Sequence, residues 1–233
     1  MAGVKRTKNT PGVQTRYHMA ELYGHDFAHL TSEEVRTLTA GCDKKQVCPF
    51  GADGAKCNKK GGVCSLRLYR KRGEHVTIPR ESLIVTTCPR RFLDGGQCLG
   101  WIAKKLIETE PPLILSEIKF LKSIAQADDE DPDSVGKIDM ILVHPDTTIL
   151  RWCAVEMQAV YFSGKGMSEE FKKLAAWDGR GIPWPGAVRR PDFRSSGPKR
   201  LMPQLQTKVP TLARWGKKTA VVIDLSFWKS LAE

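Results

Sequence analysis

The chain has 233 residues, 41% of them hydrophobic, and 37 lysines and arginines oppose 26 acidic residues, a formal net charge of +11. This length supports one domain with a sizeable core, or a core domain with a small appendage. No run of 18 apolar residues and no apolar N-terminal segment is present, which excludes a transmembrane helix and a secretory signal and favours a cytoplasmic protein.

Basic side chains are concentrated in two stretches. Residues 1–20 hold four basic side chains and no acid, and residues 189–218 hold nine against the single Asp192. Such stretches can follow a phosphate backbone, so nucleic acid is favoured as a partner over the alternative of a basic protein without a polyanionic ligand. The candidate DNA-contacting residues are Arg189, Arg190, Arg194, Lys199, Arg200 and Lys208.

Seven cysteines are present, and five of them fall between residues 42 and 88. An odd number without a secretory signal argues against a disulfide framework. The surrounding sequence, KKQVCPFGADGAKCNKKGGVCSL, is rich in glycine and lysine and poor in large apolar residues, so a bound metal is expected to stabilise it. Free thiols in a loop are the alternative.

Four of these cysteines are the preferred ligands. Cys48 and Cys88 each precede a proline, and Cys57 and Cys64 follow Cys48 at loop spacing, with Cys42 as a possible substitute. In Cys48-Pro49-Phe50-Gly51 a turn is expected to direct backbone N–H groups toward the sulfur. Four thiolates suit zinc or a single iron, and the spacing does not separate the two. The two later cysteines, Cys98 and Cys153, are expected to be buried core thiols.

The second half of the chain has the pattern of an α/β fold. Residues 98–110 predict a helix, and residues 113–121, 136–146 and 147–160 predict three strands joined by hairpin turns. A Gly/Pro-rich loop at 178–198 precedes a helix that begins near Pro203 and is expected to kink or end at Pro210. Residues 217–228 predict a last buried strand. The expected fold is an α/β sandwich with a mixed sheet flanked by helices, with residues 1–95 as a metal-binding N-terminal region and 96–233 as the core.

Polar residues interrupt the three central strands. They are Glu117 in LSEIK, Asp139 in KIDMI, and Glu156 with Gln158 in VEMQAV. Glu156 and Gln158 are two apart, so both side chains leave the same face of a strand. Lone buried carboxylates are costly and would repel one another, and a divalent cation such as Mg²⁺ would remove that conflict. The alternative is that these acids pair with lysine or arginine on an exposed face.

Asp139, Glu156 and Gln158 form a variant of the Asp…(Asp/Glu)-x-Lys pattern of PD-(D/E)xK nucleases, with glutamine in place of lysine. The chain more closely resembles the NotI restriction endonuclease family over roughly residues 20–230. The ordered matching elements are Cys48-Pro49-Phe50, Gly62-Val63-Cys64, Cys88-Pro89-Arg90, Glu156-x-Gln158, Phe162-x-Gly164, Lys199-Arg200 with Gln204 and Lys208, and Trp228-Lys229-Ser230.

The resemblance implies a type II restriction endonuclease in a prokaryotic cytoplasm, acting as a homodimer on a palindromic, GC-rich DNA site. It implies a PD-(D/E)xK core with Glu117, Asp139 and Glu156 as Mg²⁺ ligands and Gln158 at the lysine position. It also implies a structural iron held by Cys48, Cys57, Cys64 and Cys88, and a DNA methyltransferase in the same cell. The chain departs from the family in its longer gap between Glu117 and Asp139 and in ending soon after the last core strand.

Two other functions fit parts of the sequence. A repair or recombination nuclease on the same core would share the carboxylates, and sharp cleavage at one short sequence would exclude it. A non-catalytic metal-cluster DNA-binding protein would explain the charge and the cysteines, but it leaves Asp139, Glu156 and Gln158 without a purpose.

Overall fold

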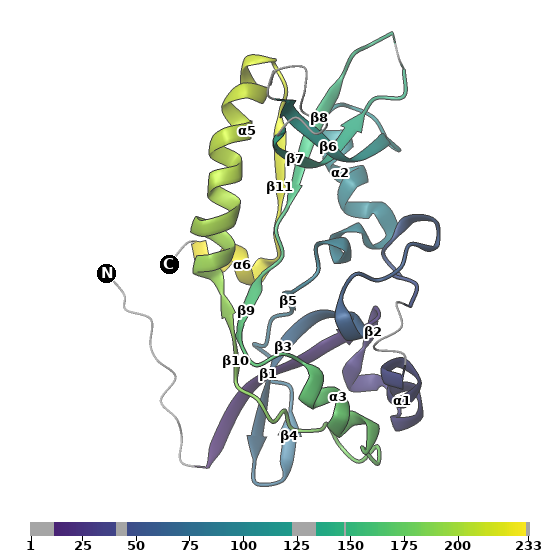
Figure 1. Ribbon diagram of the computed structural model, residues 1–233, viewed down its shortest axis with the longest axis vertical. Coiled ribbons are helices and arrows are strands. Elements are labelled where there is room, and N and C mark those ends of the chain that lie inside the picture. The colour runs from purple at the N-terminus through teal and green to yellow at the C-terminus, as the bar shows by residue number, and fades with distance from the viewer. Residues whose placement is uncertain (1–11, 41–45, 123–133, 147, 232–233) are drawn as a thin grey trace, which may run out of the picture. The chain divides into compact units, whose positions relative to one another are not determined.

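A computed structural model describes residues 12–40, 46–122, 134–146 and 148–231 (Figure 1). The chain folds into two compact units, the first from residues 1–91, 159–193 and 224–233 and the second from residues 92–158 and 194–223. Within the described residues, no helix is long and apolar enough to cross a membrane. Cys42, the acidic run at 128–133 and the N-terminal Lys5, Arg6 and Lys8 lie outside the described residues.

The first unit is built on a long antiparallel pair of strands, β1 (Val13–Leu22) and β3 (Val63–Arg72). Their sheet has the order β2-β1-β3-β4, and β5 also pairs with β3. A separate two-stranded sheet joins β9 to β10. The remaining bounds in this unit are β2 His25–Asp26, α1 Ser32–Ala40, β4 His75–Thr77, β5 Val85–Thr86, β9 Tyr161–Gly164, α3 Ser168–Ala175, β10 Arg189–Asp192 and α6 Leu225–Leu231, with short 3-10 segments at Phe27–His29, Ala52–Gly54 and Lys60–Gly62. A further 3-10 segment, Pro89–Gly96, begins in the first unit and ends in the second.

This unit has an apolar core of its own. Met19 and Leu22 of β1 and Val35 of α1 are fully buried, and Phe171 and Leu174 of α3 pack into the same cluster. The expectation that this region lacks the apolar residues for burial therefore overlooked β1 and the later contribution of α3. Cys48, Cys57 and Cys64 are part of this core.

A histidine lies within the apolar interior of the first unit. His18 is 1% exposed, and its ring meets the edges of the Phe27 and Tyr69 rings at centroid distances of 5.1 and 5.9 Å. Burial lowers the pKa of His18 from 6.5 to about 4; the nearby Glu170 opposes the shift, and Arg189 and Lys173 add to it. The imidazole is therefore neutral in the folded protein near neutral pH.

Mild acid is expected to destabilise the first unit through His18. Because its folded-state pKa is about 4, below the ordinary 6.5, the unfolded chain binds the proton first, and stability falls as pH decreases from 6.5 to 4 by about 3 kcal/mol. Urea unfolding across this range should show the loss, and His18→Phe should reduce the slope. The exposed His29 gives the control, His29→Gln, which should keep it. An unchanged slope in His18→Phe would contradict the assignment.

The second unit is a mixed sheet covered by helices on both faces. Its strand order is β11-β8-β7-β6, with β11 parallel to β8 and the other pairs antiparallel. The bounds are α2 Gln97–Leu106, β6 Leu113–Lys122, β7 Ser134–Val143, β8 Trp152–Met157, α4 Phe193–Ser196, a π-helical turn Gly197–Leu201, α5 Met202–Arg214 and β11 Thr219–Val222; α4 begins at Phe193, the last residue of the first unit. The expected mixed α/β class is confirmed.

Strand alternation separates the two faces of this sheet. Cys153 and Val155 of β8 pack with Leu99 and Ile102 of α2, whereas Ala154 packs with Leu212 of α5. The next residue on the α5 face of β8 is Glu156. The fold therefore places this carboxylate between the sheet and helix α5.

Two expectations for the C-terminal part were wrong. Helix α5 does not end at Pro210 but continues to Arg214, because the buried Thr211 and Leu212 directly after the proline hold it against the sheet; a kink at Pro210, the other half of that expectation, stays a prediction. The last strand spans only residues 219–222, and the chain then forms α6, whose first turn is capped by the Asp224 carboxylate accepting from Phe227 N–H at 2.7 Å.

Candidate active site

Asp139 and Glu156 lie level with each other on neighbouring strands. The β7–β8 ladder ends with the pair Met140 and Val155; the same register continued by one residue sets Asp139 level with Glu156, and the charge of Asp139 acts on the Glu156 carboxyl. Directly opposed residues of an antiparallel pair point to the same face. The structure thus brings together the two acids that the sequence places 17 residues apart.

The orientation of Asp139 is fixed by the backbone of the adjacent strand. Its Oδ2 accepts a hydrogen bond of 2.7 Å from Met157 N–H, the last residue of β8. The carboxylate therefore ends at the point where β8 stops, directly before Gln158. A carboxylate has about four acceptor sites, so Asp139 can serve another ligand while it keeps this hydrogen bond.

Glu156 forms a buried ion pair with a lysine from helix α5. Lys208 Nζ donates to Glu156 Oε1 at 2.8 Å and to Oε2 at 2.9 Å, with the two side chains 4% and 2% exposed. Burial raises the pKa of Glu156, the Lys208 ammonium opposes that shift, and the nearby Asp139 carboxylate adds to it. Glu156 and Lys208 are thus buried as a pair, next to the half-buried Asp139.

Gln158 continues the same strand direction just beyond β8. Its N–H donates to the Val222 carbonyl at 3.0 Å, which ties the segment to β11. The side chain carries no charge and offers one carbonyl oxygen and two N–H groups, so it can orient a polar ligand without acting as a base.

Glu117 is placed differently. Its ladder neighbours, Ser116 and Ile118, pair with Met140 and Ile138, which sets Glu117 level with Asp139. However, its φ is +52°, and its side chain is 77% exposed and lies 3.4 Å from Lys137 Nζ. This exposed ion pair agrees with the alternative that the acid pairs with lysine or arginine at the surface. The structure does not bring Glu117 to Glu156, so the candidate metal ligands are Asp139 and Glu156.

No group of three or more His, Cys, Asp or Glu side chains is arranged to hold a metal ion in the part of the chain that is described. A divalent cation at the two carboxylates would complete its shell with water and substrate oxygens, as Mg²⁺ commonly does. The paired hard oxygen donors of Asp139 and Glu156 fit such an ion in chemical type.

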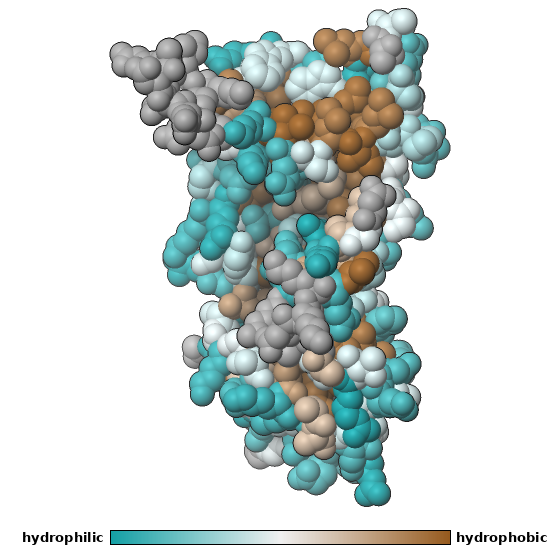
Figure 2. Space-filling model, turned by 45° about the vertical axis from the view of Figure 1, so that its right-hand side comes forward, coloured by the Kyte–Doolittle hydropathy of each residue, from teal (hydrophilic) through white to brown (hydrophobic). Residues whose placement is uncertain are grey.

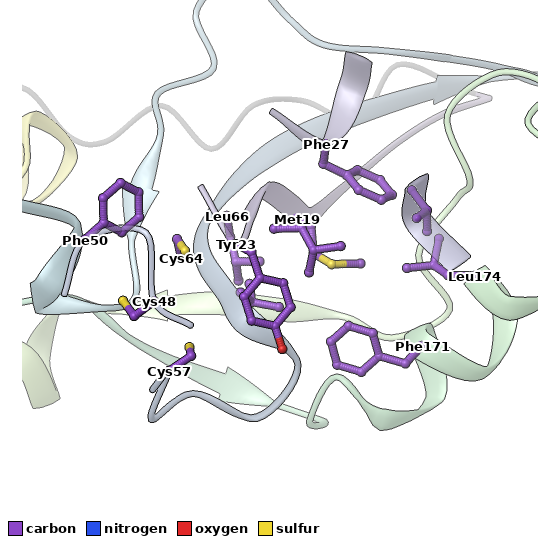
Figure 3. Packing of buried hydrophobic residues seen from close by; sticks show 13 residues of the cluster. Met19, Tyr23, Phe27, Cys48, Phe50, Cys57, Cys64, Leu66, Phe171 and Leu174 are labelled. Carbon is purple, nitrogen blue, oxygen red and sulfur yellow. The ribbon is translucent and has the colours of Figure 1, made fainter. Parts of the chain in front are cut away.

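The four candidate cysteines lie in the first unit. Among the described residues, however, their sulfur atoms are not arranged as the ligands of one metal ion. Cys48 and Cys57 come from one short hairpin, closed by Cys48 N–H to the Ala55 carbonyl at 2.8 Å and Cys57 N–H to the Gln46 carbonyl at 2.7 Å. Figure 3 shows Cys48, Cys57 and Cys64 in one region of the core. Cys88 is added by its N–H, which donates to the Cys64 carbonyl at 3.2 Å.

Electrostatics support the proximity of these thiols. The pKa of Cys64 is raised to about 12, chiefly by burial, with smaller contributions from the neighbouring Cys88 and Cys57. The pKa of Cys57 is also raised, first by burial and then by Cys48 and Cys88. Four buried soft donors within electrostatic range fit a thiolate-bound metal in chemical type. The Gly51 N–H donates to the Cys48 carbonyl rather than to its sulfur, unlike the expected turn.

A glycine next to this cluster is required by close packing. Gly62 has φ of +66°, and a side chain there would collide with the Tyr23 ring. Its carbonyl accepts from Tyr23 N–H at 2.8 Å and lies 3.4 Å from the Cys64 sulfur. The Gly62-Val63-Cys64 element therefore positions one thiol against β1.

A family comparison identifies the class of protein. The model of the restriction endonuclease NotI family matches residues 33–233. The chain belongs to the NotI restriction endonuclease family. It is therefore a restriction endonuclease, a site-specific deoxyribonuclease whose partner is DNA. No curated protein matches the chain.

The candidate DNA-contacting residues of this NotI family member fall into two groups. Arg190, Arg194, Lys199 and Arg200 are exposed. Arg189 is buried: its guanidinium donates to Glu170 at 3.1 Å and to the Lys165 and Gly166 carbonyls at 2.9 and 2.8 Å. Glu170 also accepts from Gly186 and Ala187 N–H, so this pair organises the segment before β10. Arg189 thus serves the fold, and we leave it out of the proposed DNA contacts.

Lys208 is the residue whose position the sequence reading placed least well. The sequence predicts Lys208 among the DNA-contacting residues, and this prediction is wrong for the structure, because Lys208 is buried against Glu156. A signal was present: Lys208 lies four residues after Gln204 and three before the buried Thr211, on the face of α5 that meets the sheet. A lysine on the apolar face of a helix indicates a buried acid opposite it.

Proposed function

We propose that this NotI family member hydrolyses phosphodiester bonds of double-stranded DNA with Mg²⁺, at a palindromic and GC-rich site, on a PD-(D/E)xK core. The observation that carries the proposal is the juxtaposition of Asp139 and Glu156 at the end of β8, with Gln158 following. The order of α2, β6, β7 and β8, with α5 on one face, is consistent with that core.

Each residue has a distinct part in this proposal. Asp139 and Glu156 would hold the divalent cation, which when bound polarises the scissile phosphate and makes water a better nucleophile. Met157 N–H keeps the Asp139 carboxylate turned toward the end of β8. Gln158 would orient water or a phosphate oxygen through its amide.

The exposed cations would bind the DNA backbone. Arg190, Arg194, Lys199 and Arg200 supply positive charge along one continuous stretch of sequence, and contacts of this kind set position and register rather than base preference. Binding should therefore weaken as salt rises, because each phosphate contact releases counterions.

A homodimer is part of the proposal, since two copies of one chain match the two-fold symmetry of a palindrome. The second unit has an apolar surface suited to association, visible in Figure 2. Its edge strand β6 exposes Leu113, Ile114 and Leu115. Contiguous apolar patches of this kind mark interaction surfaces more often than isolated exposed residues do.

Two further components belong to the proposal. A structural iron or zinc would be held by Cys48, Cys57, Cys64 and Cys88, supported by their burial and mutual proximity. A DNA methyltransferase of the same specificity would protect the DNA of the host cell from cleavage.

The experiment is to digest a long DNA of known sequence with Mg²⁺ and to sequence the fragment ends. We expect discrete fragments whose ends share one short palindrome, and loss of cleavage when a chelator is added. Asp139→Asn protein purified in the same way controls for contaminating nucleases. Ends without a common sequence would instead favour the repair-type nuclease, and intact DNA would favour a binding protein without catalysis.

A further inference from the structure

Lys208, the buried lysine at the candidate active site, carries the positive charge that balances the Glu156 carboxylate. Lys208 Nζ contacts both oxygens of Glu156, the Gln204 Oε1 at 3.2 Å and the Lys137 carbonyl. An ammonium has three N–H groups, and these four acceptors occupy all of them. Lys208 is therefore committed to the interior and has no proton to offer to a DNA phosphate in this arrangement.

The same contacts occupy Glu156. Both of its carboxylate oxygens accept from Lys208, and helix α5 holds the lysine by the burial of Thr211 and Leu212 on the next turn. A divalent cation that binds Glu156 must take over at least one of these oxygens. The lysine and the cation thus require the same acceptor.

We propose that Lys208 is a positioning residue that acts as the resident counter-ion of Glu156 and competes with the divalent cation for its carboxylate. This inference rests on the proposed function, in which Glu156 is a metal ligand. The residue directly after β8, where the PD-(D/E)xK pattern has a lysine, is the neutral Gln158 and supplies no positive charge. Helix α5 supplies the positive charge instead, and it keeps Glu156 in place before the metal ion binds.

A purely structural ion pair makes a different prediction from a competing counter-ion. In both cases, removal of Lys208 leaves a buried charge and destabilises the protein. Only a counter-ion that shares its acceptor with the metal ion will, on removal, increase the affinity for that ion. Metal affinity is thus the measurement that separates the two roles.

The test uses Ca²⁺, a hard cation with the same preference for oxygen ligands, and the protein without DNA. Lys208→Gln removes the charge and keeps an N–H donor for Glu156. Lys208→Arg keeps the charge. Lys217→Gln is the matched control, because Lys217 lies in the same unit and donates to the Leu150 carbonyl rather than to Glu156. Calorimetry gives the Ca²⁺ affinity, and thermal unfolding with and without Ca²⁺ gives the stabilisation.

Lys208→Gln should bind Ca²⁺ at least roughly tenfold more tightly than the wild type, because the variant has no positive charge beside the bound ion. Lys208→Arg and Lys217→Gln should bind close to the wild-type level. The rise in unfolding temperature with Ca²⁺ should be largest for Lys208→Gln. If this variant folds only when Ca²⁺ is present, that also supports the proposal, and failure to fold with Ca²⁺ overturns it.

Ca²⁺ binding by Asp139→Asn separates a failure of the proposed function from a failure of the role proposed for Lys208. Ca²⁺ binding that survives Asp139→Asn would place the ion elsewhere and overturn the proposed function. If Asp139→Asn abolishes binding while Lys208→Gln binds with wild-type affinity or more weakly, the proposed function stands and the role of Lys208 as a competing counter-ion is wrong.

Discussion

Asp139→Asn should reduce DNA cleavage by on the order of a thousandfold or more, because a metal-ligating carboxylate contributes several kcal/mol to transition-state stabilisation. The amide is nearly the same size, and its oxygen can still accept the 2.7 Å hydrogen bond from Met157 N–H. The fold and the affinity for DNA should therefore be close to those of the wild type. Single-turnover cleavage with Mg²⁺, paired with a DNA-binding assay without divalent cations, measures the two effects separately.

The control is an aspartate near the same strand that has no place at the site. Asp146 follows β7 in an exposed turn, where it accepts hydrogen bonds from the backbone and hydroxyl of Thr148. Asp146→Asn should cleave at the wild-type rate and unfold at close to the wild-type temperature, because an asparagine oxygen can still accept both hydrogen bonds in the exposed turn. Full cleavage by Asp139→Asn would remove this residue from the proposed mechanism.

The central strands could be predicted because their signals are local. The helix at 98–110 and the strands at 113–121 and 136–146 correspond to α2, β6 and β7, with boundaries shifted by a few residues. The predicted strand 147–160 became the shorter β8, because Asp146 and Thr148 close a turn that removes its first residues from the ladder. The hydrophobic periodicity predicted the strand, and the hydrogen bonds of the preceding turn determine the residue at which it starts.

The C-terminal errors have different causes. Asp224 is an N-cap residue directly before Leu225, a signal that could have separated β11 from α6 in the apolar run 217–228. Pro210 could not be judged locally. Its cost of about 3 kcal/mol within a helix is offset by tertiary packing that involves Leu212 and residues of three strands.

The candidate site could be predicted only in part, because the partners of its buried charges are distant in the sequence. Alternation predicted that Glu156 faces the interior, but the partner of Glu156 is 52 positions away on a helix whose orientation the sequence does not define. Likewise, Arg189 could not be distinguished from its exposed neighbour Arg190 without the buried Glu170. Composition identified the charges, and only the fold separated those that stabilise the interior from those that remain at the surface.

Substitution of the clustered cysteines is the second large effect that we expect. A structural thiolate site supplies on the order of 10 kcal/mol of apparent binding energy, so loss of one ligand should remove most of the metal and several kcal/mol of stability. If the cysteines act only as small buried side chains, a serine would cost about 1–3 kcal/mol for burying an unsatisfied hydroxyl. The size of the loss therefore separates a metal site from free thiols.

Cys57→Ser and Cys64→Ser are the test variants, and Cys98→Ser is the matched control. Cys98 is half-buried in the second unit, at the start of α2, so its substitution should leave the metal content unchanged. Elemental analysis of the purified proteins gives the metal and its identity, and an iron–thiolate site would also absorb visible light. Chemical unfolding gives the stability. A wild-type protein that contains neither iron nor zinc, and that loses no more stability on Cys64→Ser than a buried hydroxyl costs, would assign these cysteines to the apolar core of Met19, Leu22 and Phe27 alone.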